Sequence, residues 1–357
     1  HLGSQKWLTD LTLTRGLLTK KDDAALQREW MAAKRMAKEK LAAFIKERIG
    51  LDVDVDSLFD CQFKRIHEYK RQLLNAIYLI HRYFLIKRAS PSDRAKFMKR
   101  TCVIGGKAAP GYARAKTIIK LIGNISRVVN EDPDVSPYLK VAFLPNYSVT
   151  VAQAVCPASD ISQHISTAGT EASGTSNMKF VMNGGLIIGT MDGANIEIRE
   201  EGGHDTMFIF GCLEDEVASI KARAQEGHYP IDPRMQEVFT AIRRGDFSLG
   251  DEKAQAEFCQ IIDLLCNTTA AGTWEGDKYL LCHDFPSYVD AQSRVDATYA
   301  DKSTWARLSI QAASSMGKFS TDRTISEYAS VIWDVKAAPR PLPGSHPSPT
   351  AKSGGYP

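Results

Sequence analysis

Residues 101–129, TCVIGGKAAPGYARAKTIIKLIGNISRVV, decide the fold predicted for this chain. Their apolar, β-branched start predicts a strand over 101–104, and the glycine-rich run over 105–111 predicts a turn. Apolar residues then recur at helical spacing, which predicts a helix over 112–129. A strand, a turn and a helix in this order form the first part of a βαβ unit, in which a crossover helix joins two parallel strands.

The same alternation continues on both sides of this stretch. A helix is predicted over 70–87, and beyond residue 217 the pattern is mostly helical and ends near 328–333. Strands that alternate with helices predict an α/β fold, here a doubly wound, Rossmann-like parallel sheet with a helical C-terminal part. The other predicted strands cover 58–63, 140–144, 185–189 and 207–211.

One long helix is predicted near the start of the chain, over 22–49. Asp22 or Asp23 caps its first turn, and Gly50, which adopts the left-handed conformation easily, ends it. The lysines of its 34–46 segment are expected to face solvent, and we give them no functional role.

Three regions follow from this organisation. Residues 1–50 form an N-terminal helical segment, and residues 51–335 form the Rossmann-like domain with its C-terminal helices. Residues 336–357 are rich in proline, glycine and serine, a composition that cannot bury a core, so this tail is expected to be disordered.

Composition excludes several classes of function. The 357 residues are 43% hydrophobic, which suits a globular chain of about two domains. No apolar run is long enough for a membrane span, and the first twenty residues lack signal-peptide features, so a soluble, non-secreted protein is expected. Seven scattered cysteines without a C-x-x-C pair predict free thiols and no metal site. A net charge of +3 argues against nucleic-acid binding.

A first candidate site is the run KRIHEYKR, residues 64–71, between a predicted strand and its helix. Four cations at the end of a parallel strand can bind phosphate, because arginine offers two parallel donors and lysine a compact charge. A solvated helix start explains the same residues equally well. The glycine-rich turn over 105–111 has neither dinucleotide-binding nor P-loop spacing, so tight packing is its expected purpose.

A second candidate site is the run STAGTEASGTSNMKF, residues 166–180. Small hydroxyl residues around Gly174 can direct several N–H and O–H donors toward an anion. Lys179 follows between Met178 and Phe180, which are expected to desolvate its amine, lower its pKa and favour imine formation with an aldehyde. A lysine that extends to the surface from an apolar helix face is the other interpretation.

Four motifs in the same order carry a resemblance to a known family. They are KRIHEYKR at 64–71, GKAAPGY at 106–112, EASGTSNMKF at 171–180 and GTMDGAN at 189–195. Together they resemble the C-terminal half of α-glucan (starch or glycogen) phosphorylases of the plant and algal type, from about residue 7 to residue 328. The resemblance implies the second Rossmann-like domain of a GT-B glycosyltransferase fold, so the chain is expected to be only the C-terminal catalytic half.

The resemblance also implies a cofactor and site residues. Pyridoxal 5'-phosphate would be bound to Lys179, with its phosphate acting as proton shuttle. Arg65 and Lys70 would hold the substrate phosphate, so that Arg65, Lys70 and Lys179 are the catalytic set. The remaining implied contacts are Lys64, Lys70, Tyr147, Thr175 and Ser176 to the cofactor phosphate, and Arg65, Glu171, Ser173 and Gly174 to the substrate.

The implied reaction is phosphorolysis of the terminal α-1,4-linked glucose of a glucan to glucose 1-phosphate, by a hexosyltransferase that is a homodimer when complete and resides in the cytoplasm or a plastid. The half chain alone is expected to lack turnover, because the cleft lies between two domains. Two alternatives stay open. One is an aminotransferase or decarboxylase that uses the imine itself. The other is a non-catalytic, glucan-associated fragment.

Overall fold

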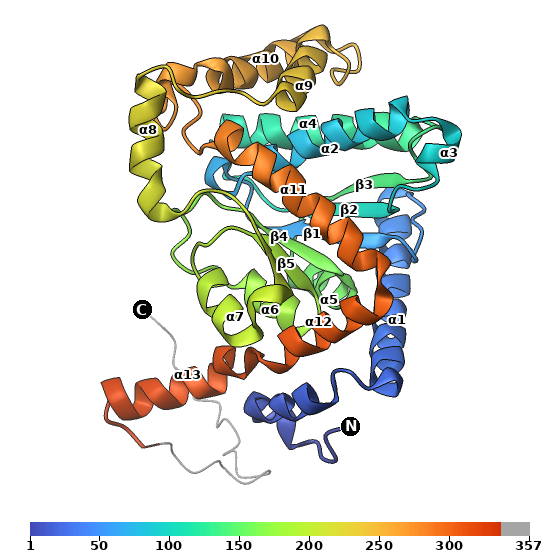
Figure 1. Ribbon diagram of the computed structural model, residues 1–357, viewed down its shortest axis with the longest axis vertical. Helices are drawn as coiled ribbons and strands as arrows, with labels where there is room; N and C mark the ends of the chain where they lie inside the picture. The colour runs from blue at the N-terminus through green and yellow to red at the C-terminus, as the bar shows by residue number, and fades with distance from the viewer. Residues whose placement is uncertain (337–357) are drawn as a thin grey trace, which may run out of the picture.

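A single six-stranded sheet forms the centre of the molecule (Figure 1). The computed structural model describes residues 1–336. All strand pairs are parallel, in the order β3-β2-β1-β4-β5-β6. This confirms the predicted doubly wound α/β fold. The strands are β1 Leu58–Phe63, β2 Arg100–Gly105, β3 Leu139–Leu144, β4 Ile161–His164, β5 Leu186–Gly189 and β6 Met207–Ile209.

Five of these strands begin and end within two residues of their predicted bounds, but β4 was not predicted. Its four residues, Ile-Ser-Gln-His, are all buried, yet three of them are polar, so no apolar run or alternation marks them as a strand. β4 forms because its backbone pairs with β1 on one side and with β5 on the other.

Helices cover both faces of the sheet. Three of them, Ala24–Ile49, Gln72–Arg88 and Ala113–Glu131, lie within two residues of their predicted bounds, whereas the helices between residues 149 and 202 were not predicted. The long first helix is capped by Asp23 and ended by Gly50, as expected. The α-helices are α1 Ala24–Ile49, α2 Gln72–Arg88, α3 Pro91–Arg94, α4 Ala113–Glu131, α5 Val149–Ala158, α6 Ser176–Met182, α7 Asn195–Gly202, α8 Val217–Gln225, α9 Pro233–Arg244, α10 Glu252–Cys266, α11 Leu281–Ala300, α12 Lys302–Ser314 and α13 Thr321–Glu327. Short 3₁₀ or π helices are η1 Lys6–Leu8, η2 Leu11–Lys20, η3 Glu68–Lys70, η4 His204–Thr206, η5 Glu214–Glu216, η6 Thr268–Ala270, η7 Met316–Phe319 and η8 Tyr328–Ile332.

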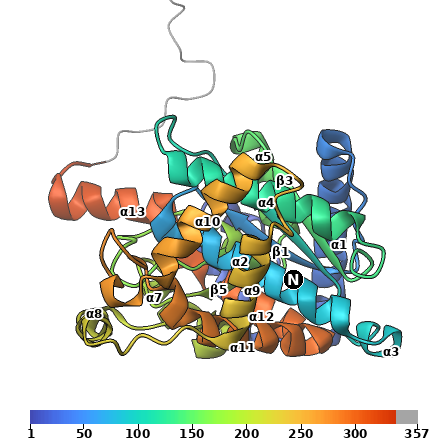
Figure 2. The ribbon, with the colours of Figure 1, turned by 90° about the horizontal axis from the view of Figure 1, so that it is seen from above.

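Two apolar cores lie on the two faces of the sheet. On one face, side chains of α1, α5 and α6 pack on Phe59, Cys61 and Phe63 of β1. On the other face, α2, α4 and α11 pack on the sheet, and α9 and α10 lie over α2 and α4 as a further layer (Figure 2). Among the described residues, no helix has both the length and the apolar character that a membrane span requires.

The expectation that the lysines of α1 face solvent is wrong for two of them. Lys34 and Lys38 are buried, whereas Lys40 and Lys46 are exposed. The reason is that α1 packs between α5 and α12, so its inner face receives hydrogen-bond acceptors from distant segments. The expected disordered tail lies, from residue 337 onward, outside the described residues.

The order of the strands fixes where ligands can bind. The chain moves from β1 to β2 and β3 on one side, and then to β4, β5 and β6 on the other side. In such sheets the two loops that leave neighbouring strands in opposite directions open a crevice at the carboxyl ends. Here that crevice lies after Phe63 of β1 and His164 of β4, where both candidate sites begin.

Candidate active site

The first candidate motif lies directly beyond β1. Lys64 is 9% exposed, and burial lowers the pKa of its amine to about 8, with the neighbouring charge of Lys70 acting in the same direction. Lys70 forms an ion pair with Glu171 of the second motif. Among the described residues, no carboxylate accepts a hydrogen bond from the Lys64 ammonium. The two candidate motifs therefore meet, and they leave one buried amine without a counter-ion.

The two arginines of this motif point in opposite directions. Arg65 is exposed, and its guanidinium makes no hydrogen bond with the described residues. Arg71 is fully buried and is paired with Asp284 at 2.6 Å, and its Nε donates to the carbonyl of Ile165 at 2.6 Å. The expectation that all four cations of 64–71 clamp phosphate is therefore wrong for Arg71, whose donors are used inside the fold.

The glycine-rich turn packs tightly against the first motif. A Cβ at Gly106 would lie 2.0 Å from the carbonyl oxygen of Lys64, and one at Gly105 would lie 2.3 Å from the Phe63 ring. Strand pairing continues past both strands, because the Ile66 N–H donates to the carbonyl of Lys107 at 3.1 Å. The turn thus serves close packing, as predicted, and it fixes the direction in which the backbone leaves β1.

A buried carboxylate holds the loop that enters the second motif. Asp192 accepts hydrogen bonds from the backbone N–H of Gly169 at 3.0 Å, from that of Glu171 at 2.9 Å and from the Ser166 hydroxyl at 2.8 Å. Gly193 follows with φ +53°, and a Cβ there would lie 2.6 Å from the carbonyl oxygen of Glu171. The turn at residues 192–193 therefore requires a hydrogen-bond acceptor followed directly by a glycine.

Asn195 links the same loop to β4 and to α6. Its Nδ2 donates to the carbonyl of His164 at 3.1 Å, and its Oδ1 accepts from Asn177 of α6 at 3.0 Å. The GTMDGAN motif contributes to the family resemblance, but the sequence alone assigns no role to Asp192 or Asn195. The signal was present, because short polar side chains at the carboxyl end of a parallel strand commonly position or bind ligands.

The loop between Glu171 and α6 presents hydroxyl groups to solvent. Ser173 and Thr175 are exposed, and Gly174 adopts φ +79°, a conformation that glycine enters at little cost. Thr175 is the cap residue of α6, and Ser176 is its first residue. Among the described residues, the Thr175 and Ser176 hydroxyls have no hydrogen-bond partner, and the Ser173 hydroxyl donates to its neighbour's carbonyl. Earlier in the run, the hydroxyls of Ser166, Thr167 and Thr170 are bonded within the fold.

Lys179 is exposed, so the expectation that Met178 and Phe180 desolvate its amine is wrong in this structure. Successive helical residues are turned by about 100°, which directs Phe180 into the core and Lys179 outward. Burial raises the pKa of the Cys156 thiol to about 11, opposed by the charges of Lys179 and Lys34. Lys179 thus lies near α5, and any desolvation of its amine must come from a bound group or another segment.

Tyr147 and His164 complete the surroundings of the crevice. Tyr147 follows β3, and its ring centroid lies 5.5 Å from that of Phe63, so it borders the end of β1. His164 ends β4, and burial moves its pKa well below the ordinary value, assisted by the charges of Lys64 and Lys70. One His164 ring nitrogen bonds to the Ser162 hydroxyl at 2.9 Å, and Nδ1 has no partner among the described residues. His164 was not predicted as a site residue.

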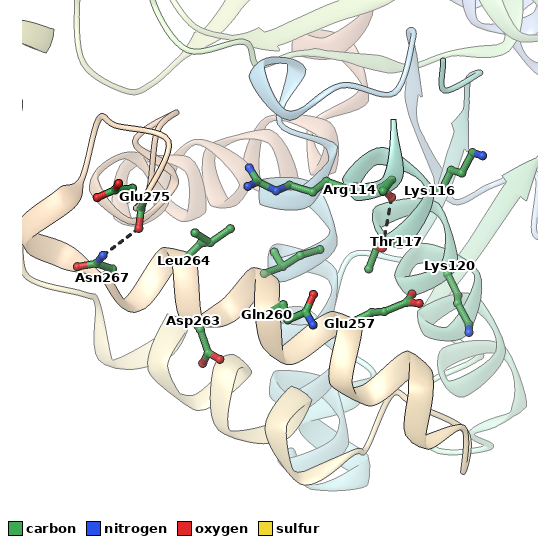
Figure 3. A pocket seen from close by; sticks show the side chains of 12 residues that line it. Arg114, Lys116, Thr117, Lys120, Glu257, Gln260, Asp263, Leu264, Asn267 and Glu275 are labelled. Carbon is green, nitrogen blue, oxygen red and sulfur yellow. Dashed lines mark hydrogen bonds between the residues drawn. The ribbon is translucent and has the colours of Figure 1, made fainter. Parts of the chain in front are cut away.

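Two hollows differ in their relation to these residues. A hollow of about 980 Å³ is lined by Glu171 and Ser173 on one side and by Arg323 of α13 on another. A second, of about 890 Å³, lies between α4 and α10 and is lined by Thr117 and Lys120 of one helix and by Glu257 and Gln260 of the other (Figure 3). No residue predicted for the site lines the second hollow, so it is separate from the crevice at the sheet.

Comparisons with known proteins agree with the motifs. A family model described as carbohydrate phosphorylase matches residues 1–335. The chain is 47% identical over 340 residues to alpha-glucan phosphorylase 2, cytosolic, of Arabidopsis thaliana, covering 95% of this chain and 40% of that protein. It is 49% identical over 342 residues to glycogen phosphorylase 2 of Dictyostelium discoideum, covering 96% and 33%.

A plastid relative is similar to nearly the same extent. The chain is 44% identical over 336 residues to the chloroplastic/amyloplastic alpha-1,4 glucan phosphorylase L isozyme of Vicia faba, covering 94% of this chain and 33% of that protein. The chain therefore spans about a third to two fifths of the length of these relatives.

Proposed function

This chain belongs to the carbohydrate phosphorylase family, and we propose that it is the C-terminal catalytic half of an α-glucan phosphorylase. The proposed activity is phosphorolysis of terminal α-1,4-linked glucose to glucose 1-phosphate. The single observation that carries the proposal is the buried amine of Lys64, which has no hydrogen-bond partner among the described residues and lies beside the Lys70–Glu171 ion pair at the crevice of the sheet. Excess positive charge in a partly buried crevice favours a bound phosphate.

The residues present fit pyridoxal 5'-phosphate. A phosphate beside Lys64 would supply the counter-ion that the fold lacks there, and Tyr147, Thr175 and Ser176 offer hydroxyl donors around the same crevice. Lys179 offers a solvent-accessible amine one helical turn beyond Ser176. When bound, the cofactor would supply a second phosphate that exchanges a proton with the substrate phosphate.

The chain's own residues would then divide the work. Arg65, whose guanidinium is exposed, and Lys70 would hold the substrate phosphate, and their charge would offset repulsion between two neighbouring anions. Glu171, Ser173 and Gly174 would orient the glucosyl hydroxyls. Asp192 keeps this loop in register with the cations, because it binds the Glu171 backbone while Lys70 binds the Glu171 side chain.

The first test asks where the cofactor binds. The chain is incubated with pyridoxal phosphate, reduced with borohydride and digested, and the labelled peptide is expected to contain Lys179. Lys179→Arg, which keeps the charge but forms no imine, is the matched control and is expected to lose the label. A label on Lys70 or Lys107 in the unmodified chain would contradict the assignment.

The second test asks what Lys64 contributes. Lys64→Met is expected to weaken binding of pyridoxal phosphate about tenfold, because a charge-assisted hydrogen bond is removed. Binding of pyridoxal, which has no phosphate, should change little. Equal losses for both aldehydes would mean that Lys64 does not contact the phosphate.

The third test concerns the whole reaction and supplies the N-terminal half of the family's chain. Joined to the N-terminal half of a plant relative, the chain is expected to release glucose 1-phosphate from a maltooligosaccharide only when phosphate is present. Activity that survives borohydride reduction would distinguish this mechanism from an enzyme that uses the imine. We further propose a homodimer of the complete protein, located in the cytoplasm or a plastid, since relatives with either location are similar to this chain.

A further inference from the structure

Lys34 occupies an unusual position for a lysine of the first long helix. It is 6% exposed, and its ammonium donates to the carbonyl oxygens of Pro157 at 2.8 Å, Ser159 at 2.8 Å and Asn183 at 2.9 Å. No carboxylate among the described residues accepts from it. All three donors of the ammonium are therefore used on main-chain oxygens.

These oxygens belong to the C-terminal ends of two helices. Pro157 and Ser159 end α5, and Asn183 is the C-cap residue of α6. Carbonyl groups at helix ends lack partners within the helix and carry partial negative charge, so one cation between two such ends satisfies both. Lys34 thus joins α5 and α6 at one point.

The opposite ends of the same helices lie at the crevice. Tyr147 precedes the cap residue of α5, and Thr175 is the cap residue of α6, which also carries Lys179. α5 is ten residues long, or about 15 Å, so a tilt at its C-terminal end displaces its start. The direction of both helices decides where these three side chains lie.

A second side chain of α1 contacts the segment that follows α6. Trp30, one helical turn before Lys34, donates from its indole to the Ser309 hydroxyl at 2.8 Å, and that hydroxyl donates to the carbonyl of Gly184 at 2.6 Å. Gly184 follows Asn183 and adopts φ +78°, and a Cβ there would lie 3.0 Å from the Trp30 ring. α1 therefore holds the end of α6 through two neighbouring side chains.

We propose that Lys34 is a positioning residue for the cofactor site, which fixes the directions of α5 and α6 and thereby the places of Tyr147, Thr175 and Lys179. The inference rests on the proposed function for the identity of the ligand. It also makes the long first helix part of the framework of the site.

The test compares three lysines of α1. Lys34→Met removes the three donors. Lys38→Met is the matched control, because Lys38 is equally buried but binds Ser57 and Asp160 instead. Lys40→Met controls for the loss of an exposed charge.

Two measurements are made on each variant of the whole chain. Hydrogen exchange of amides 152–156 and 179–182 is expected to accelerate in Lys34→Met and not in Lys38→Met. Affinity for pyridoxal phosphate, followed by imine absorbance, is expected to fall about tenfold in Lys34→Met only. Lys34→Arg, which keeps charge and donors, is expected to restore slow exchange and also covers the case in which Lys34→Met does not fold.

Equal effects of Lys34→Met and Lys38→Met on cofactor affinity, in step with their loss of thermal stability, would overturn the proposal. So would unchanged exchange of both helices in Lys34→Met. If the unmodified chain forms no imine, the proposed function fails instead, and the exchange data still decide whether Lys34 fixes the two helices.

Discussion

Two loops of the candidate site differ in how their side chains are used: the supporting loop, residues 190–195, and the facing loop, residues 171–175. In the supporting loop, Asp192 and Asn195 are buried, and both are engaged in hydrogen bonds, to backbone groups, the Ser166 hydroxyl and Asn177. In the facing loop, Ser173 and Thr175 are exposed and have few internal partners. The difference indicates that the fold positions the exposed loop through its backbone, because the buried side chains of the supporting loop bind backbone groups.

The same division occurs within one motif. Arg71 is buried against Asp284, while Arg65, six residues earlier, is exposed and makes no side-chain hydrogen bond within residues 1–336. One run of cations therefore combines a buried structural arginine with an exposed one. The contrast predicts that changes in the supporting set reduce stability, whereas changes in the facing set reduce ligand binding alone.

The largest effect is expected at Arg71. Arg71→Met leaves Asp284 buried without its counter-ion and should lower the free energy of unfolding by about 4 kcal/mol. Burial raises the pKa of Asp284, but Arg71 helps to hold it below its ordinary value, so the stability that this ion pair contributes should be lost in the unmodified chain as the pH falls through that lowered value. The difference in stability between the unmodified chain and the variant should therefore shrink at low pH. Urea denaturation measures this effect. Arg65→Met is the control, and a comparable loss there would break the contrast.

The next effect is expected at Asp192. Asp192→Ala removes the acceptor of two backbone N–H groups and one hydroxyl, and should cost about 3 kcal/mol. Asp192→Asn keeps the shape of the side chain but turns one acceptor into a donor, so its loss of stability should lie between zero and that of Asp192→Ala. Thermal unfolding measures the stability, and ligand affinity should fall in the same order. A stable Asp192→Ala chain with unchanged affinity would show that the loop needs no support.

A smaller effect is expected at Gly193. Gly193→Ala places a methyl group 2.6 Å from the carbonyl oxygens of Glu171 and Ser173, and should cost about 2 kcal/mol. Gly50→Ala is matched to it, because Gly50 also has positive φ but has no atom within 4 Å of the added methyl. It should cost about 1 kcal/mol by strain alone. Equal losses of stability in the two variants would mean that contact between the added methyl group and the carbonyl oxygens contributes nothing.

The smallest effect concerns the protonation of Lys64. Its pKa is lowered to about 8 in the folded chain, below the ordinary 10.5, so the unfolded chain binds more protons between these values and Lys64 makes stability rise there with pH. Sulfate, which does not titrate in this range, binds the protonated amine. Its stabilisation, under about 1 kcal/mol, should be complete below pH 7 and disappear as the pH rises through 8.

Lys64→Met isolates this titration from those of Lys34 and Lys302, whose pKa values burial also lowers to about 8. In that variant sulfate should have little effect at any pH. A sulfate effect that persists unchanged at pH 9 in the unmodified chain would assign the anion to other groups, such as Arg65.

Sequence reasoning predicted most of the fold and only part of the site. Five of six strands were predicted, because apolar runs identify buried parallel strands, but β4 is short and partly polar, and its partners lie in distant segments. The two candidate motifs do meet, through Lys70 and Glu171. The predicted roles of Arg65, Tyr147, Thr175 and Ser176 stay predictions.

Two other predictions are wrong because burial depends on segments that are distant in the sequence. Lys34 and Lys38 were assigned to solvent by the composition of α1, and their acceptors lie more than a hundred residues away or beyond a long turn. Lys179 was expected to be desolvated by Met178 and Phe180, but the helix turns these side chains away from its amine. Neighbours in sequence do not decide burial on a helix.

The sequence by itself determined the order of elements, the family and the two motifs that carry the candidate site, because periodicity, turn residues and motif spacing are properties of near neighbours along the chain. Only the tertiary structure decided that Arg71 turns inward, that Asp192 holds the loop and that Lys34 joins α5 to α6. Burial and charge pairing depend on which distant segments pack together, and local patterns do not contain that information.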